Sequence, residues 1–154
     1  MSASIRNELV NAVVARFQTV RVANGFLTDA GANVFLWRLH PLTPEEMPGI
    51  VLRDRRTETR LEGRVVHEHR LYFEADLYAP TGTDPRALLA DAQSAVGKDI
   101  RWKVGSTILA VDTQPLDDEL DASQEERLLR GCRYRFQVIF RTRPFNPFAL
   151  ASPT

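Results

Sequence analysis

Apolar residues at every fourth position mark the first element of this chain. They are Ile5, Leu9, Val13 and Phe17. This spacing places them on one face of a helix. Ser4 precedes them, where a side-chain hydroxyl caps a first turn by accepting a backbone hydrogen bond. The pattern therefore predicts a helix over residues 5–17 that packs by one face against the rest of the protein.

Alternation with a period of two begins at residue 49 and indicates strands. It is clearest over residues 70–78, where every second side chain is apolar, at Leu71, Phe73, Ala75 and Leu77. The positions between them carry Tyr72, Glu74, Asp76 and Tyr78. Since successive side chains of a strand point to opposite faces, we expect one buried face and one face that is wet or covered by a partner. The charged stretch before this strand predicts a hairpin turn near Glu62 and Gly63.

A second helix is predicted over residues 86–96. Asp84 and Pro85 suit its N-cap and first helical position, and Gly97 suits its end. Its apolar stripe consists of Leu88, Leu89, Ala92, Ala95 and Val96. Shorter apolar runs predict minor strands at residues 34–37, 100–104 and 107–111.

Two blocks of opposite charge lie next to each other in the last third of the chain. Residues 112–126 carry seven acids and no base, and residues 127–143 carry six arginines and no acid. The acidic block predicts a solvated loop. In the basic block, apolar residues alternate with polar ones, which predicts a long final strand with an arginine-bearing outer face. Residues 144–154 contain three prolines and two phenylalanines and predict an extended arm.

The order of elements predicts an α+β fold, with one domain over residues 1–143 and the C-terminal arm over residues 144–154. Two main helices would pack on a predominantly antiparallel sheet, because no regular strand–helix–strand alternation indicates a parallel one. The chain has 154 residues, of which 44% are hydrophobic and 26% charged, and this suits one compact domain.

Charge balance and cysteine content narrow the class of protein. Lys and Arg together number 20, as do Asp and Glu, which gives a net charge of zero and disfavours a basic nucleic-acid-binding protein. No apolar run approaches the roughly 20 residues that span a bilayer, and the first residues lack a secretory-signal pattern. The single cysteine, Cys132, suits a reducing compartment. We therefore expect a soluble, cytoplasmic protein with no membrane partner.

The sequence offers little enzyme chemistry. It lacks the phosphate-binding, dinucleotide-binding and nucleophile-elbow motifs. Cys132 falls on the inward side of the predicted final strand, so we expect a buried structural thiol. His67 and His69 would share one strand face and could approach one metal ion, but a zinc site needs further ligands, and the remaining histidine is His40. Surface histidines are therefore favoured, and we predict no catalytic residue, metal or cofactor.

The charged blocks and two tyrosines supply candidate interface residues. Acids of the first block are expected to face arginines of the second, either within one chain or between copies. Within a chain they would neutralise each other; between copies they would steer and register an assembly. Net neutrality disfavours phosphate binding by the arginines. The candidates are Arg133, Arg135, Arg141, Asp117, Asp118, Glu119, Asp121, Tyr72 and Tyr78.

Over residues 4–143, the sequence of elements resembles the tail terminator and tail completion proteins of long-tailed bacteriophages, a group that includes the lambda-type minor tail protein U. The resemblance is carried by an amphipathic helix, a proline leading into a strand, a long alternating strand, an Asp-Pro-capped helix and a closing strand. The corresponding stretches are IRNELVNAVVARF, EEMPGIVLRD, RVVHEHRLYFEADLYA, DPRALLADAQSAVG and CRYRFQVIFRT. Residues 24–48, the acidic block and the C-terminal arm have no clear counterpart in that pattern.

The resemblance implies a structural virion protein that forms a ring, usually a hexamer. Such a ring caps the tail tube, ends tube polymerisation and offers a joining surface to the head-side connector. The implied partners are other copies of this chain, the tail tube protein and a connector or neck protein. The implied location is the head-proximal end of the virion tail, after assembly in the host cytoplasm. The alternatives are another connector or baseplate subunit and, less favoured, a small metal-dependent enzyme that uses His67 and His69.

Overall fold

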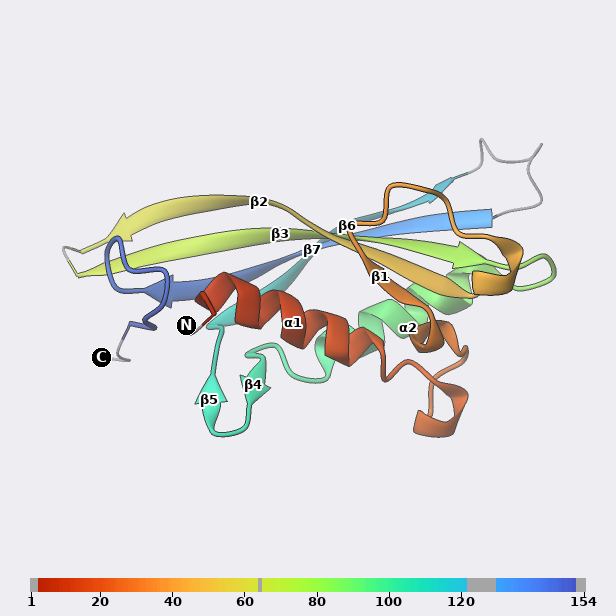
Figure 1. Cartoon of the computed structure of the whole chain (residues 1–154), viewed down its shortest axis with the longest axis horizontal. Helices are drawn as coiled ribbons and strands as arrows, with labels where there is room; N and C mark the ends of the chain where they lie inside the picture. The colour runs from red at the N-terminus through yellow and green to blue at the C-terminus, as the bar shows by residue number, and fades with distance from the viewer. Residues whose placement is uncertain (1–2, 64, 122–129, 152–154) are drawn as a thin grey trace.

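A computed structural model describes residues 3–63, 65–121 and 130–151 of the chain (Figure 1). It confirms the predicted single-domain α+β class. In chain order the main elements are α1 (Ile5–Phe17), β1 (Val34–Leu36), β2 (Gly49–Glu62), β3 (Val66–Ala79), α2 (Pro85–Gly97), β4 (Lys103–Val104), β5 (Thr107–Ile108), β6 (Asp112–Asp121) and β7 (Arg130–Thr142). Short 3₁₀ turns lie at Val22–Asn24, Ala30–Ala32 and Pro44–Glu46.

Five strands form the main sheet in the order β1-β2-β3-β7-β6. Only the pairing of β1 with β2 is parallel among the described strands. Both helices lie on one side of this sheet, and its other side is open (Figure 1). The predicted hairpin between residues 49 and 79 is confirmed: β2 and β3 pair from Gly49 opposite Tyr78 to Glu62 opposite Val66.

The two helices begin where their caps predict. The Ser4 Oγ accepts a hydrogen bond from the backbone N–H of Asn7 at 3.1 Å, and the Asp84 carboxylate accepts one from Arg86 at 2.9 Å. Every apolar residue of the predicted first stripe is buried. In the second stripe Leu89 is only half-buried. None of the helices in the described part of the chain is long and apolar enough to cross a membrane.

The core lies between the helices and the inner face of the sheet. Phe73 and Phe136 stack there with ring centroids 5.1 Å apart, and Phe17 of α1 approaches Phe136 at 6.2 Å. Trp102 is fully buried in the same hydrophobic cluster. Its indole N–H donates to Thr113 Oγ1 at 2.8 Å, and the Arg16 guanidinium lies 3.6 Å from its ring centroid.

The acidic stretch differs from its prediction. Its residues 112–121 form β6, an edge strand antiparallel to β7, rather than a loop. Acidic side chains are compatible with this strand because its outer edge faces solvent and arginines of β7 lie opposite. Pro115, which lacks an N–H, is tolerated on such an edge, and the register shifts just after it. Residues 122–126 of the predicted loop lie outside the described residues.

Two further predictions need correction. The strands at residues 103–104 and 107–108 are shorter than predicted and form a small separate hairpin. The C-terminal segment does not run as an extended arm: it turns back on the sheet, where Arg143 N–H donates to the Ala149 carbonyl at 3.0 Å and Ala151 N–H to that of Arg141 at 3.1 Å. The turn is closed by Asn146, whose side-chain oxygen accepts from Phe148 N–H at 3.1 Å, as asparagine does in many turns.

Candidate functional site

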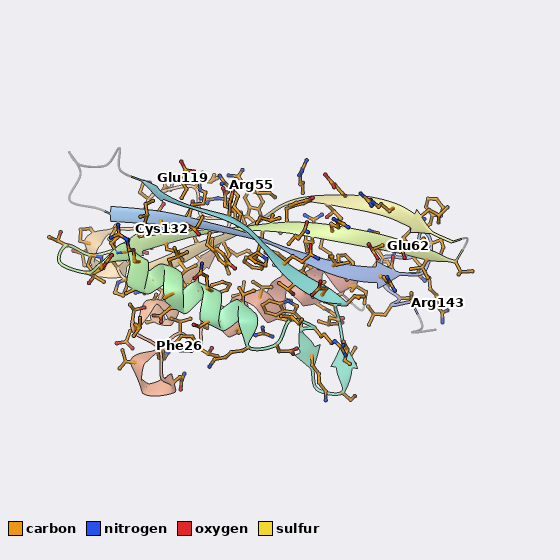
Figure 2. All side chains as sticks on the ribbon, turned by 180° about the vertical axis from the view of Figure 1, so that it is seen from behind. Phe26, Arg55, Glu62, Glu119, Cys132 and Arg143 are labelled. Carbon is orange, nitrogen blue, oxygen red and sulfur yellow. The ribbon has the colours of Figure 1, made fainter. Side chains whose placement is uncertain are left out.

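The open face of the sheet carries a layer of arginines and carboxylates, which we call the outer face. It draws on β2, β3, β7 and β6, whose side chains point alternately to the helices and away from them. In Figure 2, Arg55 and Glu119 lie on this face, opposite the helices. Its paired members at the centre are Arg53, Arg55, Arg133, Arg135, Glu74, Asp76, Asp117 and Glu119.

Glu74 is the centre of this layer. Its side chain is only 6% exposed, and burying a carboxylate is costly unless it is paired. Its Oε2 accepts a hydrogen bond from Arg55 Nε at 2.7 Å. Its Oε1 lies 3.0 Å from Arg133 Nε and 3.4 Å from Arg135 Nε. Three guanidinium groups therefore surround one buried acid.

A second, half-buried pair extends the layer toward β1. Asp76 forms an ion pair with Arg53 and accepts a hydrogen bond from Arg133 Nε at 2.7 Å. The hydrogen bond to Asp76 raises the pKa of Arg133. Arg53 also donates to the carbonyl of Arg38 at 3.0 Å, so the loop after β1 is fixed to the sheet.

In the structure, the three predicted interface arginines form ion pairs with different groups of acids. Arg135 meets the acidic block within the chain: its guanidinium lies 3.1 Å from Asp117 and 4.0 Å from Glu119. Arg133 instead pairs with acids of β3, as described above. Arg141 also pairs outside the acidic block, with Glu68 at 3.0 Å and Glu62 at 3.4 Å. Neither these two glutamates nor Glu74 and Asp76 were among the predicted candidates. The alternation of β3 had nevertheless placed Glu74 and Asp76 on its non-core face.

The remaining candidates lie in three different settings. Tyr72 donates to Glu58 at 3.2 Å, and the Arg56 guanidinium lies 4.5 Å from its ring centroid. Burial, followed by the negative charge of Asp76, raises the pKa of Tyr78. Asp118 stands opposite the inward-facing Tyr134, where its charge adds to burial in raising the pKa of that tyrosine. The backbone of Asp121 pairs with Gly131, but its side chain lies outside the description.

The charges at the centre of the outer face balance. Its four arginines and four carboxylates are bound to one another. A neutral surface has no net field to attract a phosphate backbone. The arrangement can therefore rigidify the sheet and present a polar surface.

The two histidines lie on the other side of the sheet, near the tip of the β2–β3 hairpin. Their ring centroids are 6.1 Å apart. Both ring nitrogens of His69 are hydrogen-bonded to hydroxyls, Nδ1 to Thr59 at 2.8 Å and Nε2 to Thr142 at 2.7 Å. Burial lowers the pKa of His69, which favours the neutral ring. Among residues 3–63, 65–121 and 130–151, no group of three or more His, Cys, Asp or Glu side chains is placed to hold a metal.

A pocket of about 350 Å³ opens beside these histidines. We call it the tip pocket. Its walls include Arg6 of α1, Thr57 of β2, both histidines, Phe140 of β7 and Phe145 of the C-terminal segment. Sequence reasoning did not foresee it, because it forms only where the C-terminal segment folds back beside α1. There the Ile5 N–H donates to the Pro147 carbonyl at 2.9 Å.

Cys132 is a buried thiol, as predicted. Burial, aided by the charge of Asp118, raises its pKa from 9.0 to about 11. Since the thiolate is the reactive form of cysteine, this thiol is a poor nucleophile at neutral pH.

Comparisons with known proteins do not identify a family for this chain. No protein-family model matches the chain, and no curated protein matches it.

Proposed function

We propose that this chain is the subunit of a ring-forming tail terminator of a long-tailed bacteriophage. In this role a ring, expected to be a hexamer, caps the tail tube, ends its polymerisation and joins the tail to the head-side connector. The protein would then reside in the virion, at the head-proximal end of the tail, after assembly in the host cytoplasm.

The observation that carries the proposal is the contrast between the two faces of the sheet. One face is covered by α1 and α2 (Figure 2), and the other is an open layer of paired charges from β2, β3, β7 and β6. An antiparallel sheet with a rigid, neutral and polar open face is suited to contact other protein subunits in register. It is equally suited to lie near DNA without holding it.

The chemistry of the described side chains supports a structural role. The ionisable groups at the centre of the outer face are bound to each other, Cys132 is held as a thiol, and His69 is hydrogen-bonded through both nitrogens. These contacts stabilise a surface, whereas a general acid or base needs an exchangeable proton within reach of a substrate.

The proposal is tested first by the state of the pure protein. Native mass spectrometry is expected to give a closed oligomer, six chains in the favoured case, and negative-stain images are expected to show rings with a central hole. A protein that stays monomeric at high concentration would contradict the proposal.

A second experiment tests the place of the ring in the particle. Tail tube protein polymerised with this chain is expected to give shorter tubes, each ending in a ring, whereas tube protein alone gives tubes of uncontrolled length. Co-purification with portal-bearing heads rather than with tubes would instead favour a connector subunit.

A further inference from the structure

The free end of the β2–β3 hairpin exposes apolar side chains around the tip pocket. Leu61 is 62% exposed and Phe145 is 92% exposed. Leu61 stands directly opposite His67 in the strand register, and the His67 ring meets the Phe145 ring edge-on with centroids 4.8 Å apart. These three side chains form one continuous surface beside the pocket, which we call the tip patch.

Phe145 combines a strained backbone with a solvent-exposed ring, which is unusual in a surface that has no partner. Its φ is +55°, in the left-handed region that bulky residues avoid, and such a backbone costs about 1–3 kcal/mol. The ring it presents is almost fully in water, so burial within the chain does little to offset that cost. Exposed apolar surface grouped beside a pocket is typical of a protein–protein contact.

The tip patch is flanked by positive charge. Arg143 lies two residues before Phe145; its side chain is exposed and has no acidic partner in the described part of the chain. Arg60, by contrast, stands opposite Glu68 in the strand register, on the other face of the sheet from Leu61. Figure 2 shows Arg143 at the same end of the sheet as Glu62, whose carboxylate is engaged by Arg141 at 3.4 Å. A complementary surface would therefore be apolar and acidic.

The edge strand β6 carries such a surface. Leu116 and Leu120 are 44% and 40% exposed, and between them lie Asp117, Asp118 and Glu119. Only Arg135 pairs with this segment among the described residues, through the first and last of these acids, so Asp118 has no cationic partner. We call Leu116–Leu120 the acidic edge.

The two surfaces cannot meet within one chain. Leu120 aligns across β7 with Leu77 of β3, and Leu61 aligns with His67 of the same strand. Ten residues of strand separate these two positions of β3, which corresponds to about 33 Å. In Figure 2, Glu119 lies toward the end of the sheet opposite Glu62 and Arg143.

We infer that the acidic edge of one copy docks on the tip patch of the next copy in the ring. A leucine of the acidic edge enters the tip pocket beside Phe145, and Asp118 faces the unpaired Arg143. Two different surfaces of one chain then join head to tail, the kind of contact that generates rings when its rotation closes. This inference rests on the ring proposed above and names the surfaces that build it.

The test uses two variants that each remove one surface. Phe145→Asp places a negative charge on the tip patch, and Leu120→Asp removes an apolar contact from the acidic edge. Both side chains are exposed, so each variant is expected to keep its thermal midpoint within about 2 °C of the parent protein. Each is expected to weaken subunit association at least tenfold in native mass spectrometry, as loss of a central contact does. Val22→Asp is the matched control, since Val22 is 56% exposed in the 3₁₀ turn Val22–Asn24, away from both surfaces.

Mixing the two variants distinguishes this contact from other modes of assembly. The Leu120→Asp chain keeps an intact tip patch, and the Phe145→Asp chain keeps an intact acidic edge. An equimolar mixture is therefore expected to give heterodimers, each with one intact contact, and no rings.

Four results would overturn the inference. Both variants could form rings as the parent does, which would leave the proposed ring intact and reject only these surfaces. The Val22→Asp control could dissociate as well. Rings could persist in Phe145→Asp while tube capping is lost, which would assign the tip patch to the tube. A monomeric parent protein would reject the ring itself.

Discussion

Glu74 connects the strands on both sides of β3 across the outer face. Three arginines from β2 and β7 converge on its carboxylate, which is almost completely buried. If a neutral amide replaces the carboxylate, the three guanidinium groups repel one another. They also lose the charged acceptor of their hydrogen bonds.

Glu74→Gln is therefore expected to lower the free energy of unfolding by about 2 kcal/mol. This is less than the full loss of a buried ion pair, because the arginines are one third to one half exposed and water screens them. Urea denaturation measures the change. Glu119→Gln is the matched control: its side chain is 66% exposed and 4.0 Å from Arg135, so its expected effect is below about 0.5 kcal/mol. Equal effects of the two changes would contradict this account.

At the scale of single residues, the sequence predicts which side chains face inward but not which charged side chains form ion pairs with each other. Period-two alternation identified Leu71, Phe73 and Cys132 as inward, and the structure confirms them as buried. The partner of Arg133 depends on the register of β7 against β3, which is set by the packing of whole strands. Alternation along one strand excludes odd-numbered shifts, which would expose the apolar face, but it does not select among registers that differ by two residues.

Among the elements, α2 is tied to the loop before β1 by a buried acid. Asp91 is 3% exposed, and its carboxylate accepts hydrogen bonds from the backbone N–H groups of Leu27 and Thr28, both at 2.8 Å. It also accepts one from the Thr28 hydroxyl at 2.7 Å. The helix thereby satisfies the donors of a segment that has little regular structure of its own.

Asp91→Ala is expected to destabilise the protein by about 3 kcal/mol, because buried donors would lose a charged acceptor. Asp84→Ala, which removes only the N-cap of the same helix, is expected to cost about 1 kcal/mol. Chemical denaturation compares the two variants, and hydrogen exchange is expected to show faster exchange at Leu27 and Thr28 in Asp91→Ala alone. A loss no larger than that of Asp84→Ala would contradict this role.

The elements that sequence predicts well are those whose own residues determine them. The amphipathic repeat and Ser4 define α1, and Asp84 with Pro85 defines the start of α2. The strand β6 was missed because its acids are stabilised by β7, a partner that is distant in sequence from Asp112. The folding-back of the C-terminal segment was missed for a similar reason, since the hydrogen bonds that dock it are made to Arg141 of β7 and Ile5 of α1.

For the molecule as a whole, acid is expected to reduce stability in two stages. Burial lowers the pKa of His69 below 6.5 in the folded protein, so the unfolded chain binds this proton more readily. Stability is therefore lost as the pH falls below 6.5 and through the lower folded pKa. The Arg38 hydrogen bond lowers the pKa of Glu46 from 4.5 to about 2, and its contribution is lost as the pH falls from 4.5 toward 2.

Urea midpoints measured over this pH range check both stages. His69→Gln is expected to flatten the decline between pH 6.5 and pH 4.5, and Glu46→Gln is expected to reduce the decline below pH 4.5. Persistence of the full upper decline in His69→Gln would show that other groups cause it.

At the scale of the whole molecule, the sequence predicted the fold class but not the position of the charged and apolar surfaces relative to each other. The tip pocket needs α1, two long strands and the C-terminal segment to converge. The separation of the tip patch from the acidic edge follows from the length of β3 and from strand order. Both are properties of the assembled sheet rather than of any one stretch of residues.

The burial of Trp102 provides an optical probe of this assembly. Its indole is held between a hydroxyl acceptor on β6 and a guanidinium from α1, whereas Trp37, the second of the chain's two tryptophans, is 43% exposed. The emission of Trp102 should therefore lie to the blue of the emission of Trp37. A red shift of the blue component would report that α1 has separated from the sheet, without any label attached to the protein.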